Sequence, residues 1–151
     1  MTVHVRRADQ EDAPAVADVY LRARHAAVPA LPPLVHDDED VRAWVDGVLV
    51  AQQEVWVAET GGVVVGMMAV NGRWLDHLYV DPAWTDRGVG SRLVQLAKRG
   101  REELLLWTFE ANTGARRFYE RHGFNAVEHT DGSSNEEQTP DVRYRWRREQ
   151  G

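Results

Sequence analysis

The sequence predicts an α/β (α+β) fold, with a single mixed, mostly antiparallel β-sheet of about seven strands flanked by helices on both faces. Two β-rich runs, 54–60 and 63–70, surround a Gly61-Gly62 pair, which is a strong signal for a β-hairpin. The run 104–109 is unbroken and apolar, as in a strand covered on both faces. Strand and helix patterns follow one another in the order β-α-α-β-β-β-α-β-α-β-β, which favours one sheet between two helical layers.

The segment before the hairpin predicts one short strand and two helices. Residues 3–7 alternate between apolar and polar, as a strand does, and Asp9 can cap a helix that begins at about residue 11. Three prolines place a loop over residues 29–36. Asp37 or Asp38 can cap a second helix. The apolar face of that second helix is expected to carry Val41, Trp44, Val45 and Val48.

The second half of the chain predicts four more strands and two helices. A strand over residues 73–80 stops at Pro82, because proline cannot donate a ladder hydrogen bond and restricts the residue before it. From Gly88 the spacing of apolar residues becomes helical, and the strand 104–109 follows. Asn112 can cap another helix, which Gly123 ends. Two last strands, 124–129 and 142–146, are joined by a polar loop over residues 131–140.

Composition limits the classes of function. The chain has 151 residues, of which 43% are hydrophobic and 28% charged, as in an ordinary folded domain. The net charge of −6 and the scattered basic residues argue against nucleic-acid binding. The lack of cysteine excludes disulfides, thiolate catalysis and cysteine-bound metal, and we expect no metal. No segment has the roughly 20 apolar residues of a membrane span, so we expect a cytoplasmic protein with no membrane partner; a homodimer is left open.

Gly88-Val89-Gly90 lies where the strand 73–80 passes through a short turn into a helix. Free N–H groups and the positive end of the helix dipole converge at such a turn, which makes an anion site suited to a diphosphate. Glycines allow phosphate oxygens to approach the backbone closely. Taken alone, this short motif fits equally well a helix start whose glycines serve only the turn.

Two blocks of sequence resemble the GNAT superfamily of N-acetyltransferases. The first runs from Leu75 to Leu93 and contains Leu-Tyr-Val-Asp-Pro followed by Arg-Gly-Val-Gly-Ser. The second, residues 112–124, is similar to the family pattern Asn-x-x-Ala-x-x-Phe/Leu-Tyr-x-x-x-Gly-Phe. With a family-like opening near residue 5, the likeness covers about residues 3–146. One departure is Thr85, where the family usually has Gln or Arg three residues before the first glycine.

The resemblance implies a GNAT-like fold and acetyl-CoA as the co-substrate. It implies that main-chain groups of Leu78 and Val80 pair with the pantetheine arm, and that the backbone from Arg87 to Ser91 surrounds the pyrophosphate. Asn112 also fits a plain helix cap, and Phe118 a core position. The coenzyme-binding residues expected on this basis are Leu78, Tyr79, Val80, Arg87, Gly88, Val89, Gly90, Ser91, Asn112 and Phe118.

Acetyl transfer to an amine requires a base and favours an acid. An alkylamine with a pKa of about 10.4 is protonated at pH 7 and must lose a proton before it attacks. We favour Asp76 as the base, directly or through water, and keep His77 as the alternative with the better ordinary pKa. Side chains alternate along a strand, so only one of the two can line the acceptor side unless the strand has a bulge. The resemblance implies Tyr119 as the acid near the coenzyme sulfur, and each of the three residues also fits a structural role.

We therefore expect residues 1–151 to form a single N-acetyltransferase domain. It would transfer an acetyl group from acetyl-CoA to a primary amine of a small molecule or a peptide, by direct attack in a ternary complex. The loops 29–36 and 131–140 should form the acceptor cleft. Glu136, Glu137 and Asp141 could attract a cationic amine there, although solvated surface charge is the more ordinary role for such residues. Two alternatives stay open: a catalytically silent acyl-CoA-binding domain, and a regulator that binds another nucleotide.

Overall fold

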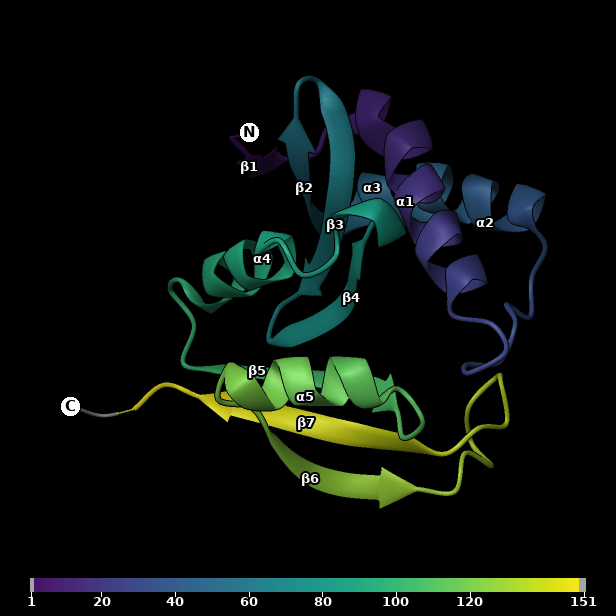
Figure 1. The fold of residues 1–151 in the computed structure, drawn as a ribbon, viewed down its shortest axis with the longest axis vertical. Coiled ribbons are helices and arrows are strands. Elements are labelled where there is room, and N and C mark those ends of the chain that lie inside the picture. The colour runs from purple at the N-terminus through teal and green to yellow at the C-terminus, as the bar shows by residue number, and fades with distance from the viewer. Residues whose placement is uncertain (1, 150–151) are drawn as a thin grey trace.

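The computed structural model describes residues 2–149, which contain one seven-stranded sheet in the order β1-β2-β3-β4-β5-β7-β6 (Figure 1). All neighbouring strands are antiparallel except β4 and β5, which run parallel. The mixed, mostly antiparallel sheet is therefore confirmed. The strands are β1 (His4–Arg7), β2 (Glu54–Thr60), β3 (Val63–Asn71), β4 (Trp74–Val80), β5 (Glu103–Phe109), β6 (Asn125–Thr130) and β7 (Asp141–Arg147).

Helices cover both faces of the sheet, as predicted. One apolar cluster, which includes Leu93 and Leu104, packs α4 and α5 against one face. A second cluster, with Val16 and Met67, packs α1 and α2 against the other. None of the helices within residues 2–149 is long and apolar enough to cross a membrane. The helices are η1 (Gln10–Asp12), α1 (Ala13–Ala26), α2 (Asp38–Trp44), η2 (Val45–Leu49), α3 (Val50–Gln52), η3 (Pro82–Trp84), α4 (Val89–Lys98) and α5 (Thr113–Arg121).

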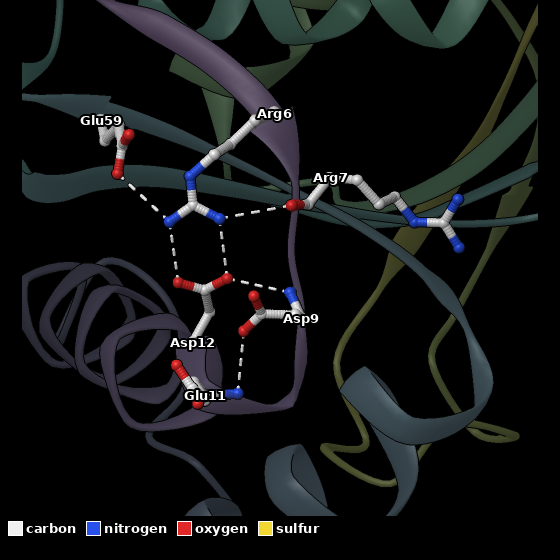
Figure 2. Close-up of polar contacts among 6 residues, drawn as sticks. All are labelled: Arg6, Arg7, Asp9, Glu11, Asp12 and Glu59. Carbon is white, nitrogen blue, oxygen red and sulfur yellow. Dashed lines mark hydrogen bonds and ion pairs between the residues drawn. The ribbon is translucent and has the colours of Figure 1, made fainter.

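The start of the helical segment is held by a capping box and an arginine (Figure 2). The Asp9 carboxylate accepts a hydrogen bond from the Glu11 amide, and the Asp12 carboxylate accepts one from the Asp9 amide, both at 2.9 Å. Arg6 donates to both oxygens of Asp12, at 2.8 and 2.9 Å, and to Glu59 at 3.2 Å. The hydrogen bonds from Arg6 lower the pKa of Asp12 to about 2. The cap predicted at Asp9 is thus present, and Arg6 links it to β1 and β2.

The second helical segment contains a π-helical turn, η2. Asp37 is the cap, because its carboxylate accepts a hydrogen bond from an amide of the first turn of α2. Val41, Val45 and Leu49 are buried, whereas Val48 is 40% exposed. The prediction that Val48 belongs to the apolar face is therefore wrong. A π-turn takes up more residues than an α-turn, so Leu49 occupies the place that α-helical spacing assigns to Val48.

Strands β4 and β5 share only one residue pair, and this positions the functional site. Trp74 pairs with Leu105, next to a 2.8 Å hydrogen bond from the Leu105 amide to the Arg73 carbonyl. Beyond that point the two strands have no ladder partners in each other within residues 2–149. In Figure 1, β1–β4 form the upper part of the view and β5–β7 with α5 the lower part. The centre of the sheet therefore opens between two parallel strands.

Candidate active site

The edge of β4 that faces β5 carries unpaired backbone groups. The Asp81 amide donates to the Val65 carbonyl at 2.8 Å, so this pair is hydrogen-bonded towards β3. Hydrogen-bonded and non-hydrogen-bonded pairs alternate along antiparallel strands. Val80 and Leu78 therefore form non-hydrogen-bonded pairs with their partners on β3. Their N–H and C=O groups point towards the open edge, where an extended ligand could lie beside β4.

A β-bulge interrupts β4 at Asp76. Ala69 of β3 pairs with His77, and the next residue of β3, Val70, pairs with Leu75. Asp76 is the extra residue and has no partner on β3. Asp76 and His77 both line one cavity. The expectation that only one of the two lines the acceptor side is limited to a strand without a bulge, and β4 has one.

The cavity has a volume of about 710 Å³, within the range of small-molecule sites, and lies between β4 and β5. Both loops predicted to form the acceptor cleft, 29–36 and 131–140, line this cavity. The two loops are in contact, because His36 Nε2 of the first lies 2.7 Å from Glu136 Oε1 of the second. Glu137 and Asp141 also line the cavity, whereas residues 87–91 do not. Within residues 2–149, no three His, Asp or Glu side chains are grouped so as to hold a metal ion.

Burial moves the pKa values of the two base candidates in opposite directions. The His77 ring lies 5.7 Å from that of Tyr20 and 5.3 Å from that of Trp44. Burial, together with the nearby charge of Arg24, lowers the pKa of His77 to about 4, so the imidazole is neutral at pH 7. Burial raises the pKa of Asp76 above its ordinary value. Asp76 thus moves towards the pKa that suits a base near neutral pH, and His77 moves away from it.

Tyr119 places a phenol in the cavity wall. Its side chain is 8% exposed and packs edge-on against Phe118 and Phe124, with ring centroids 5.2 and 5.5 Å away. Its hydroxyl makes no hydrogen bond to another described residue. Burial, and to a smaller extent the neighbouring Tyr79, raises the pKa of Tyr119, so the phenol keeps its proton at neutral pH.

The turn before α4 presents a row of free amides. Gly88 caps the helix with a φ of 82°, and the Arg92 amide makes the first helical bond, to the Gly88 carbonyl at 3.1 Å. No acceptor within residues 2–149 bonds the amides of residues 87–91. A side chain at Gly88 would enter open space, with nothing within 4 Å of its Cβ. This is the arrangement that an anion at a helix N-terminus requires.

The other predicted coenzyme residues have protein partners. The Ser91 hydroxyl lies 3.0 Å from His122 Nε2. The Asn112 side chain accepts a hydrogen bond from the Ala115 amide at 3.1 Å, so it caps α5, and it also lines the cavity. Phe118 packs against His122 with ring centroids 4.7 Å apart. The helix-cap role of Asn112 is therefore present, and its contact with the coenzyme stays a prediction, whereas Phe118 lies outside the cavity lining.

Sequence reasoning missed Arg24, which is 6% exposed and lines the cavity. Its guanidinium donates to the Pro32 carbonyl at 3.2 Å and lies over the Phe109 ring, 5.6 Å from the centroid. The one signal in the sequence is spacing, because Arg24 follows the buried Tyr20 by four residues on the same helix.

Comparison with known proteins gives the family. The profile of a family described as "Acetyltransferase (GNAT) domain" matches residues 51–126. The amino-acid acetyltransferase of Mycobacterium tuberculosis is 36% identical over 129 residues, which cover 74% of this chain and 71% of that protein. The uncharacterized N-acetyltransferase YafP of Escherichia coli is 38% identical over 77 residues, 51% of this chain. That match spans about half, 49%, of the length of YafP.

Solved structures agree in fold. Apo YjaB from Escherichia coli superposes with a TM-score of 0.79 at 24% identity, covering 97% of this chain and 98% of that one. PaiA N-acetyltransferase from Thermoplasma acidophilum, in complex with coenzyme A, gives a TM-score of 0.72 at 20% identity, covering 98% and 100%. The profile match, the mycobacterial relative and the opened sheet agree with the two motif blocks: the chain belongs to the GNAT acetyltransferases.

Proposed function

We propose that this chain transfers an acetyl group from acetyl-CoA to a primary amine of a small molecule or a peptide, by direct attack in a ternary complex. One observation carries the proposal. The turn at residues 87–91 and the open edge of β4 together present a run of unpaired backbone donors, and Leu78 of that edge lines the cavity. Two side chains in the cavity can exchange protons: the Asp76 carboxylate, whose pKa is raised, and the Tyr119 phenol, which is protonated at neutral pH.

The coenzyme fits this run of donors. The amides of residues 87–91 would hold the diphosphate, and the space in front of Gly88 leaves room for its oxygens. The outward groups of Leu78 and Val80 would bind the pantetheine arm as a neighbouring strand does. The related fold from Thermoplasma acidophilum was solved with coenzyme A, which supports the assignment. When bound, acetyl-CoA supplies an acetyl group activated as a thioester.

Asp76 and Tyr119 would handle the protons. Asp76 is exposed to the cavity and accepts a proton from the acceptor ammonium, directly or through one water. Tyr119 donates its proton to the departing sulfur, because burial keeps the phenol protonated until then. An ammonium acceptor loses two protons. Asp76 takes the first and passes it to solvent. The second leaves the nitrogen as the N–C bond forms and the C–S bond breaks, and it balances the proton that Tyr119 gives to the thiol. His77, neutral and packed between aromatic rings, would shape the cavity wall.

Acidic side chains favour a cationic acceptor. Asp40, Glu136, Glu137 and Asp141 all line the cavity and raise the local concentration of an ammonium group. One relative, from Mycobacterium tuberculosis, is an amino-acid acetyltransferase, so small amines and amino acids belong in the first set of acceptors to be tried. The cytoplasmic location and the homodimer stay predictions.

The test is a thiol-release assay with acetyl-CoA and a panel of amino acids, polyamines, aminoglycosides and lysine peptides. Calorimetry with CoA, ATP and NAD runs in parallel. We expect a heat of binding with CoA but not with ATP or NAD, and thiol release with at least one amine. CoA binding without turnover on any acceptor would favour the silent acyl-CoA-binding domain. Heat with ATP or NAD and none with CoA would contradict the proposed function.

A further inference from the structure

Arg24 brings an isolated positive charge into the acceptor cavity. Among the described residues that line this cavity, it is the only arginine or lysine. Helix α1 places it one turn after Tyr20, and 94% of its surface is covered, since 6% is exposed. The remaining charged residues of the lining are acidic or histidine.

The protein satisfies the guanidinium of Arg24 only in part. One nitrogen donates to the Pro32 carbonyl at 3.2 Å, and the group lies over the Phe109 ring. The Nε atom is buried and has no hydrogen-bond partner in the part of the chain that the structure describes. No carboxylate of residues 2–149 lies within 4.0 Å of Arg24, although ten other ion pairs meet that limit.

A buried and unpaired guanidinium lowers stability, because the charge loses its hydration without gaining a counter-ion. The neighbouring phenols do not neutralise the charge of Arg24. Burial raises the pKa values of Tyr20 and Tyr79, so both hydroxyls stay uncharged at neutral pH, and Arg24 opposes that shift by its charge and by hydrogen bonding to both side chains. Arg24 lines the cavity although its buried charge lowers stability, which is typical of a group that binds an anion.

We infer that the acceptor is an amine that also carries a carboxylate, as a free amino acid does, and that Arg24 binds this carboxylate. The inference rests on the proposed acetyl transfer and narrows its acceptor class. The free N–H groups of the planar guanidinium match the two oxygens of a carboxylate. The acceptor amine would then lie towards Asp76, so the two charged ends of one small molecule meet opposite charges in the same cavity.

A carboxylate fits better than a phosphate or phosphonate. Arg24 offers a single positive charge, which matches one negative charge. A second negative charge would be repelled by Asp40, Glu136 and Glu137, which line the same cavity. An internal peptide lysine carries no carboxylate close to its amine and is therefore a poorer acceptor.

The experiment compares each of the common amino acids with its C-terminal amide, and with an aminoalkylphosphonate, in the thiol-release assay. We expect kcat/KM for the best acid to exceed that for its amide at least about tenfold, and the phosphonate to be poorer than the acid. Arg24→Met should lower the acid-to-amide ratio at least about tenfold, to about one, as expected for the loss of a buried charge-assisted pair. An amide or phosphonate preferred over the acid would overturn the inference.

Two controls separate binding from folding. Arg22→Met removes an arginine of the same helix that pairs with Asp81 at 2.8 Å outside the cavity, and should leave the ratio unchanged. Arg24→Met should unfold at the same temperature as the wild type or higher, because it removes an unpaired buried charge. A loss of stability with equal losses for acid and amide would assign Arg24 a structural role.

A second readout needs no turnover. With CoA present, the best amino acid should raise the unfolding temperature of the wild type, and its amide should not. Arg24→Met should lose this shift. If the shift is present but no thiol is released, the carboxylate site stands and the proposed catalysis fails. If thiol is released equally from acids and amides, and the amino acid and its amide shift the unfolding temperature by the same amount, the proposed catalysis stands and the inference fails.

Discussion

Gly90 of α4 and Phe118 of α5 are in close contact: a Cβ on Gly90 would lie 3.2 Å from the Phe118 ring. Gly90 therefore permits the close packing of these helices. Gly88 differs, because its φ of 82° requires glycine while its surroundings are open. Gly90 is thus required for helix packing, whereas Gly88 allows the left-handed backbone conformation and leaves space for a ligand. Gly88 is thus the better position at which to test anion binding.

Gly88→Glu should weaken CoA binding at least about 100-fold, because it places bulk and a negative charge beside the diphosphate. Isothermal calorimetry measures this. Gly100→Glu is the matched control: Gly100 has a φ of 71°, open surroundings and a place at the other end of α4. Both variants should lose about 1–2 kcal/mol of stability from the strained backbone. Equal CoA affinities for the two folded variants would remove the phosphate site from this turn.

Asp76→Asn should lower kcat/KM by about 10²- to 10⁴-fold, the usual effect of removing a general base. His77→Phe keeps an aromatic ring between Tyr20 and Trp44 and should lower it by less than about tenfold, because an imidazole with a pKa of about 4 is a weak base. Steady-state kinetics with the best acceptor measures both. A larger loss of kcat/KM in His77→Phe than in Asp76→Asn would make His77 the base and contradict that role for Asp76.

Tyr119→Phe should lower kcat by about 10²-fold or more and leave the free energy of unfolding within about 0.5 kcal/mol, because the lost hydroxyl has no partner among the described residues. Tyr144→Phe should do the reverse. The Tyr144 hydroxyl donates to Glu120 at 2.7 Å and accepts from Arg116 at 3.0 Å, so its loss should cost about 1 kcal/mol and spare kcat. Full kcat in a folded Tyr119→Phe enzyme would show that the phenol is not the acid.

Asp12→Asn should remove part of the acid sensitivity of the fold. The folded-state pKa of Asp12, about 2, lies below its ordinary value of 3.8. Its stabilising effect is therefore complete above about pH 4 and is lost as the pH falls towards 2. In urea unfolding, the variant should be about 1–2 kcal/mol less stable than the wild type at pH 7, and the two should converge near pH 2.

The control for that series is Asp18→Asn, which breaks a more exposed ion pair between α1 and α2, to Arg42 at 2.8 Å. Such a pair contributes little, so this variant should stay within about 0.5 kcal/mol of the wild type across the range. A constant difference between wild type and Asp12→Asn from pH 7 to 2 would contradict the linkage between Arg6 and Asp12.

Local signals were sufficient for most of the fold. Period-2 runs, the Gly61-Gly62 hairpin and the caps at Asp9 and Asn112 each depend on residues close in sequence, and each is present. The bulge at Asp76 could not be predicted, because an extra residue in a strand is visible only against the partner strand. Val48 was assigned to the wrong face because a π-turn leaves no mark in α-helical spacing.

The site was predicted where a motif marks it and missed where packing makes it. Residues 87–91 lie at a strand-to-helix turn that local sequence specifies, and their amides are free. The burial of Arg24 depends on the loop that contains Pro32 and on Phe109 of β5, which are distant in sequence. An arginine on a helix ordinarily faces solvent, so the spacing of Arg24 from Tyr20 is the one local sign that it enters the cavity.

The most direct test of the account is amide hydrogen exchange, resolved by residue with NMR, with and without CoA. In the free protein the amides of residues 88–91, Leu78 and Val80 should exchange fast, because no described residue accepts from them. Saturating CoA should slow the exchange of all of them, while the exposed amide of Gly100 stays fast. Unchanged exchange at residues 88–91 in a protein that binds CoA would place the diphosphate elsewhere and contradict the account.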